Sequence, residues 1–214
     1  MLRDEARDQV KRILGYNTAS TIATDIEETL RFVQNELEND PELPFFLKEE
    51  VTNLVTVANT ERLSPPPGFI RIWDEDALWI LEPGSDPETW TPLEKDEPKY
   101  LRKALQGKGK AQPVAYAWDG SDFLLFPTPD AVYTLRLIYY KADTVLSSNI
   151  TNKWLTYLPY LMIAKTGMIL SASIRDQSAT PVFQGMLQSE TVRLNSMTVD
   201  RDGSGRKLVV GGPD

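Results

Sequence analysis

The spacing of apolar residues predicts helices at the start of the chain. In residues 2–14, and again in residues 18–38, apolar side chains recur every three or four positions, which places them on one face of an α-helix. Gly15 stands where a helix C-cap glycine is expected. The second helix ends before Pro41, because proline disfavours the helical conformation in the residue before it. Residues 1–44 are therefore predicted to form a helical hairpin whose apolar stripes need a partner surface.

The pattern then changes to that of short β-strands. Residues 51–57 are rich in β-branched side chains. The segments 69–73 and 78–81 are predicted to pair with each other as two strands around an acidic turn. The same module, residues 45–147, also contains a short helix from Lys99 to Leu105.

The strongest strand signals lie in the second half of this module. Ala115–Trp118 and Phe123–Phe126 flank the Asp119-Gly120 turn, which predicts a β-hairpin. Tyr133–Tyr140 shows alternation typical of a strand.

Helical patterns return in residues 148–200. Asn152 is a good N-cap residue, Pro159 can open a new helical turn, and Thr180-Pro181 is typical of the start of a last helix. Residues 201–214 are rich in glycine and are predicted to form a flexible tail.

These segments predict an α+β fold with helices at both ends and strands between them. We expect the N- and C-terminal helices to form one helical bundle. An antiparallel β-module, sandwich-like or barrel-like, is then an insertion into that bundle.

Composition removes several classes of chemistry. The 214 residues include neither cysteine nor histidine. Disulfides, thiolate zinc sites, cysteine nucleophiles and histidine bases are therefore excluded. The 31 acidic residues leave a carboxylate-pair mechanism open. We find no nucleotide-binding, zinc-protease or serine-hydrolase motif, and we expect no catalytic residue, no metal and no cofactor.

The net charge of −8 argues against general nucleic-acid binding, which needs a basic face. Acidity fits a surface that DNA must pass without sticking, and it also fits a protein that charge simply keeps in solution. No apolar run approaches the ~20 residues of a membrane span. The charged start of the chain lacks the apolar region of a secretory signal.

Two groups of residues are candidates for contacts between subunits. Lys99, Arg102 and Lys103 belong to a basic cluster that extends to Lys108 and Lys110, and its alternative interpretation is a solvated helix face. Trp79 and Trp90 are the second group, since tryptophan is favoured in binding hot spots. The other three tryptophans lie in apolar contexts where core packing suffices.

Several segments match a known family in their order along nearly the whole chain: Leu43–Leu47, Pro67–Ile70, Trp90–Lys95, Tyr100–Arg102, Pro113–Ala117, Leu125–Tyr140, and Leu146–Ser147 with Asn152–Leu155. In this order the sequence resembles the head-to-tail adaptor (head-completion, or connector) subunits of tailed bacteriophages. The rigid Pro65-Pro66-Pro67 run and the glycine-rich tail are departures from the family pattern.

The resemblance implies a non-catalytic virion protein located in the neck and assembled in the host cytoplasm. Such subunits form a homo-oligomeric ring, typically a dodecamer, between the portal protein and the tail tube or nozzle protein. They extend the channel through which genomic DNA passes without specific binding, and no membrane is involved.

The tail is the candidate for contact with the portal. Its apolar clip Leu208-Val209-Val210 can add to a partner sheet, while Arg206 and Lys207 dock on an acidic rim. The alternative is a frayed terminus. Two other functions stay open: a different tail or baseplate adaptor, and a carboxylate-dependent cell-wall glycan hydrolase.

Overall fold

The structure is a computed structural model that describes residues 1–16, 21–41, 43–86, 88–105, 109–147, 149–174 and 178–202. Its helices and antiparallel-rich sheets make the α+β class predicted from the sequence. Two compact units divide the chain. One contains Met1–Leu47 and the described residues from Asp143 onward, and the other is Lys48–Ala142.

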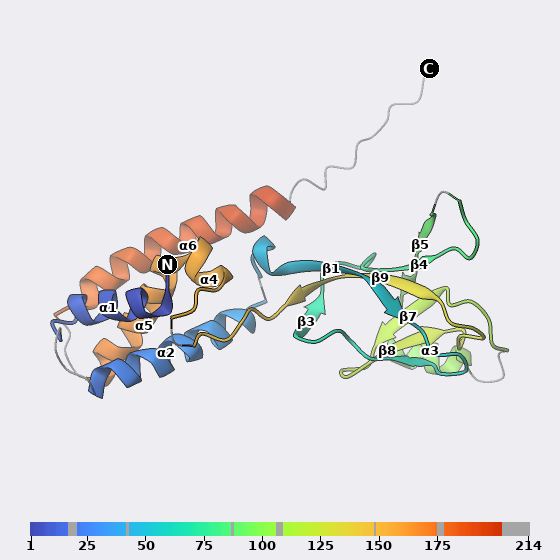
Figure 1. The fold of residues 1–214 in the computed structure, drawn as a ribbon, viewed down its shortest axis with the longest axis horizontal. Helices are drawn as coiled ribbons and strands as arrows, with labels where there is room; N and C mark the ends of the chain where they lie inside the picture. Colours follow the sequence, from blue (N-terminus) through green and yellow to red (C-terminus); the bar gives the residue numbers. More distant parts are fainter. Residues whose placement is uncertain are drawn as a thin grey trace, which may run out of the picture. The chain divides into compact units, whose positions relative to one another are not determined.

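The first unit is helical, and α5 is the helix on which the others pack. α5 contacts α1, α2, α4 and α6 (Figure 1). It is apolar on most of its surface, which is the pattern of a helix covered by neighbours. The elements of this unit are α1 (Arg3–Ile13), α2 (Thr21–Glu38), the 3-10 turn η1 (Phe45–Leu47), α4 (Lys153–Tyr157), α5 (Pro159–Ser173) and α6 (Thr180–Asp202).

Glycine allows α5 and α6 to approach closely. Gly167 of α5 faces Phe183 of α6, and a methyl group on Gly167 would lie 2.2 Å from the Phe183 ring. Phe183 is fully buried. A larger residue than glycine therefore does not fit at position 167 without moving the ring.

A buried polar network ties the returning chain to α2. The Gln34 amide donates to the carbonyl oxygens of Asp143 and Thr144, and its oxygen accepts from Asn152 at 3.2 Å. The predicted N-cap is confirmed, because the Asn152 side chain accepts from the Leu155 backbone N–H at 2.9 Å. These bonds satisfy polar groups that would be costly to bury alone.

The second unit contains two sheets that share one hydrophobic core. The five-stranded sheet has the order β1-β9-β4-β5, with β3 also paired to β9, and the four-stranded sheet has the order β2-β8-β7-β6. The strands are β1 (Lys48–Val55), β2 (Arg62–Leu63), β3 (Phe69–Ile72), β4 (Leu78–Leu81), β5 (Trp90–Pro92), β6 (Glu94–Lys95), β7 (Ala115–Trp118), β8 (Phe123–Phe126) and β9 (Thr134–Lys141). Residues of both sheets meet in the core, among them Leu63, Leu78, Ile80, Tyr116, Phe123, Leu135 and Leu137.

The predicted pairing of residues 69–73 with 78–81 is wrong. β3 and β4 do not form a hairpin but lie end to end along β9. Ile138 of β9 accepts from the Trp73 N–H and donates to the Ala77 carbonyl, so that it joins the ends of both short strands. β9 has eight residues and can pair with two four-residue strands in succession, and the acidic segment between them, residues 74–76, is exposed.

Of the other strand predictions, one is confirmed and one is partly wrong. The hairpin of β7 and β8 around Asp119-Gly120 is confirmed. The expectation of a purely antiparallel module is wrong at one place, since β6 pairs with β7 in parallel. The described strands form two open sheets and do not close into a barrel.

Candidate interaction surfaces

Three residues of the predicted basic cluster lie on α3, the helix Pro98–Leu105. Lys110 lies outside this helix, and its amine donates to the Asn59 side-chain oxygen at 2.7 Å. Lys99, Arg102 and Lys103 are all exposed. Leu101 is 3% exposed and anchors the helix, in a small apolar cluster with Ala115, Ala117 and Leu124. The helix therefore presents its cations on the side opposite to its apolar anchor.

Arg102 differs from the two lysines because it contacts an acidic loop. Its guanidinium lies 3.4 Å from the Asp119 carboxylate, which also accepts from Arg62 at 2.8 Å. Two backbone N–H groups, those of Asp122 and Ser121, donate to the other oxygen of Asp119. These backbone bonds, with Arg62 adding to them, hold the pKa of Asp119 well below its ordinary value.

The two candidate tryptophans are brought together by a residue that the sequence did not single out. The Arg136 guanidinium lies over both rings, 4.9 Å from the centroid of Trp79 and 5.0 Å from that of Trp90. Trp79 is the direct cross-strand neighbour of Arg136 in the sheet. Such distances are those of cation–π contacts. Both indoles are half-buried, so part of their surface is already used within the chain.

This stack lies on the face of the five-stranded sheet that points away from the core. Leu135 and Leu137 of β9 are buried in the core, and Arg136 between them points to the opposite side. The Arg136 Nε lies 3.7 Å from the Glu50 carboxylate. Alternation along β9 could have placed Arg136 on this face, but its aromatic partners depend on the strand register.

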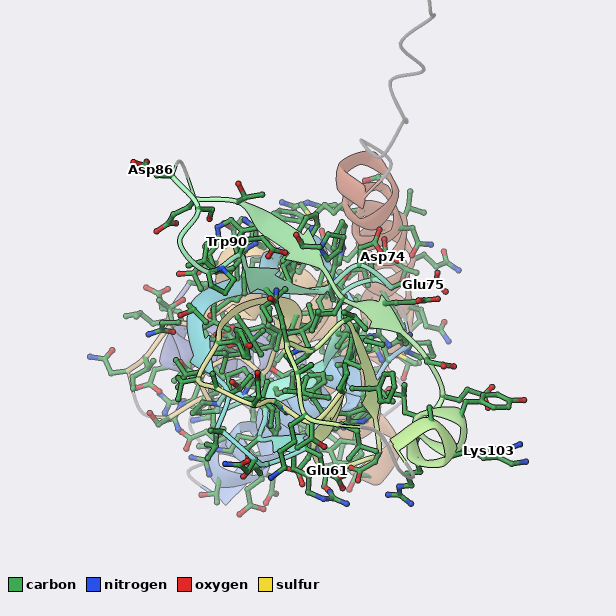
Figure 2. The ribbon with its side chains drawn as sticks, turned by 90° about the vertical axis from the view of Figure 1, so that its right-hand side faces the viewer. Glu61, Asp74, Glu75, Asp86, Trp90 and Lys103 are labelled. Carbon is green, nitrogen blue, oxygen red and sulfur yellow. The ribbon has the colours of Figure 1, made fainter. Side chains whose placement is uncertain are left out.

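The structure does not combine the two groups into one surface. In Figure 2, Trp90, the first residue of β5, lies well apart from Lys103 of α3 on the β-rich unit. The proposed portal contacts Arg206, Lys207, Leu208, Val209 and Val210 lie outside the described residues, as does Lys108.

The two most exposed aromatic side chains among the described residues were missed by the sequence analysis. Phe32 of α2 is 60% exposed and Tyr100 of α3 is 56% exposed. The signal for Phe32 was present, because it falls outside the apolar stripe of its helix. Exposed aromatic side chains of this size are common anchors in protein interfaces.

The described carboxyl groups whose pKa is clearly shifted do not have the raised pKa of a glycoside hydrolase acid. A general acid needs a pKa raised toward neutral pH. The described carboxyl groups with a displaced pKa, Asp4, Glu82 and Asp119, are all shifted downward, and hydrogen bonds to each carboxylate are the main cause. No cluster of three or more acidic side chains in the described part of the chain is arranged to hold a metal ion.

Comparison with known proteins identifies one family. The family model described as SU10 adaptor protein matches residues 1–209. No curated protein matches the chain. Among the helices that the structure describes, none is long and apolar enough to cross a membrane.

Proposed function

The chain belongs to the phage SU10 adaptor protein family, and from this we propose that it is a non-catalytic ring subunit that joins the portal to the tail. As a phage adaptor it is a structural component of the virion neck. Beyond this role, we propose that the subunit connects the portal to the tail and that its ring extends the channel through which the genome passes.

The extent of the family match is the observation that carries this proposal. Residues 1–209 include both compact units and both helical ends. The match therefore covers the helical unit as well as the β-rich unit, and is not limited to a β-module that different proteins could share.

Three further properties belong to the proposal. Copies of the chain assemble as a homo-oligomeric ring, a dodecamer by family resemblance, in the host cytoplasm. The tail residues Arg206–Val210 attach the ring to the portal, and a tail tube or nozzle protein binds the other side. The net charge of −8 lets DNA pass without phosphate contacts.

Co-assembly with the portal of the same phage tests the proposal. The purified chain is mixed with purified portal particles, and mass photometry measures how many copies each particle gains. We expect a saturating increase that corresponds to one ring per portal. Failure to gain mass at any adaptor concentration would overturn the joining role. A cell-wall zymogram tests the hydrolase alternative, for which we expect no clearing.

A further inference from the structure

The two most exposed aromatic side chains of the described residues, Phe32 and Tyr100, lie on helix faces of opposite charge. Phe32 lies on α2 of the helical unit, and Tyr100 lies on α3 of the β-rich unit. Exposure of a large aromatic ring leaves apolar area in water that a partner can bury.

The α2 face combines Phe32 with carboxylates. Asp25, Glu28, Phe32 and Glu36 follow one another at spacings of three, four and four residues, which places them on one side of the helix. Glu36 binds Lys165 of the same unit at 2.7 Å. Asp25 and Glu28 are exposed and form no ion pair with any residue that the structure describes.

The α3 face combines Tyr100 with amines. Lys99, Tyr100 and Lys103 lie on the side away from the buried Leu101, and Figure 2 shows Lys103 extending from the helix. Arg102 is turned toward Asp119 instead. Within the described ranges neither lysine has an ion-pair partner. The α3 face is thus the charge complement of the α2 face, with one aromatic ring at each.

We propose that these faces are the two halves of one contact between neighbouring copies, in which the α3 face of one copy docks on the α2 face of the next. This inference rests on the proposed ring. The two surfaces differ, so the contact is heterologous, which is the kind of contact that forms a ring when the rotation between neighbouring copies closes. The rings of Phe32 and Tyr100 are the apolar anchors, and the charges fix orientation and speed the encounter.

Charge and stoichiometry favour a second copy of the chain as the partner of each face. Every copy carries one acidic α2 face and one basic α3 face. Each acidic face can therefore pair with the basic face of a neighbouring copy, and only the two ends of an open chain of copies keep an unpaired face. Two identical faces could not pair in this way, because like charges placed directly opposite each other repel.

Charge reversal provides the test. One variant carries Lys99→Glu and Lys103→Glu, and the other carries Asp25→Lys and Glu28→Lys. Alone, each presents two faces of the same sign, so we expect self-association, measured by sedimentation velocity up to about 1 mM, to weaken at least about ten-fold. In an equimolar mixture every contact pairs opposite signs again. We expect the mixture to regain wild-type association, with the two variants alternating in chemically cross-linked dimers.

A matched control separates this contact from net charge. Lys11→Glu with Arg12→Glu changes the net charge by the same amount as the first variant but alters α1, and we expect it to retain wild-type association. Circular dichroism verifies that each variant is folded. The inference is overturned if either reversed variant associates as the wild type does, if the mixture does not recover, or if the wild type itself does not associate.

Portal binding distinguishes this inference from the function on which it rests. A chain that shows the expected reversal and recovery but gains no mass on portal particles would refute the joining role alone. Reversed variants that load portals in wild-type copy number would refute the contact alone.

Discussion

Replacing Gly167 by alanine should destabilise the helical unit, although the same substitution at Gly185 should stabilise it. Both glycines lie inside helices, where alanine is favoured over glycine by about 1 kcal/mol. They differ in what a new methyl group would meet. At Gly185 nothing lies within 4 Å, whereas at Gly167 three atoms of the Phe183 ring lie at 2.2, 2.3 and 2.4 Å.

The expected magnitude follows from these distances. Carbon atoms in ordinary contact are about 3.5–4.0 Å apart, so the ring or the helix must move by more than about 1 Å. Phe183 is fully buried in a packed interior, which places the cost near the upper end of the overpacking range, about 3 kcal/mol. After the helix-propensity gain of about 1 kcal/mol, the net loss is about 2 kcal/mol. For a chain of this size that loss lowers the Tm by about 4–8 °C.

Thermal unfolding followed by circular dichroism at 222 nm measures both substitutions. The Gly185→Ala variant should unfold at a Tm a few degrees above that of the wild type. Adding Phe183→Leu to Gly167→Ala makes room for the methyl group, so the double variant should lose less stability than the sum of the single losses, by about 1 kcal/mol or more. Equal Tm values for Gly167→Ala and Gly185→Ala would refute the close approach of α5 and α6.

Four other predictions concern separate parts of the chain. Asn152→Ala should lower the free energy of unfolding, measured in urea, by about 2–4 kcal/mol, because it removes the α4 N-cap and a buried donor to Gln34. Asn152→Asp keeps the cap, so a loss for Asn152→Ala that is no larger than the loss for Asn152→Asp would contradict this. The pKa of Asp119 is lowered in the folded state, so its carboxylate stabilises the fold above the ordinary pKa of 3.8, and this contribution is lost as the pH falls below that value. Asp119→Asn should therefore lower the free energy of unfolding more at pH 7 than at pH 3. Equal losses at the two pH values would refute the lowered pKa of Asp119. Deleting residues 201–214 should leave the Tm within about 1 °C yet abolish portal attachment, whereas normal attachment would assign the joint to the helices. The free chain should sediment as a monomer at micromolar concentration and physiological salt, because the net charge of −8 opposes association; a stable closed ring there would contradict it.

Elements with a local cause could be predicted from the sequence. The β7–β8 hairpin follows from an Asp-Gly turn between two apolar runs. The start of α4 follows from Asn152, whose side chain caps the helix as its residue type predicts. In both places the determining interactions lie within a few residues, so the sequence pattern contains them.

Elements that depend on distant pairing could not be predicted. β3 and β4 look like a hairpin because a polar turn separates two apolar runs, and only the long β9 makes them collinear. The parallel pairing of β6 with β7 has no local signature either, since β6 has only two residues. For the same reason the tryptophan candidates were named without Arg136, whose position opposite Trp79 is a matter of register.

The proposed contact and the net charge act over different distances, and together they favour assembly on a template. Between whole chains the charge of −8 is repulsive, whereas the contact between the Lys99–Lys103 face and the Asp25–Glu28 face is attractive at short range. Repulsion between free chains slows their association. A portal that binds several copies side by side would bring them close together, and the short-range contact would then close the ring. Salt screens exposed charges beyond about 10 Å at 0.1 M, so moderate salt weakens the repulsion before it weakens a desolvated contact. Self-association of the wild type should therefore first increase with salt and then fall, whereas a contact made by exposed charges alone would weaken from the start.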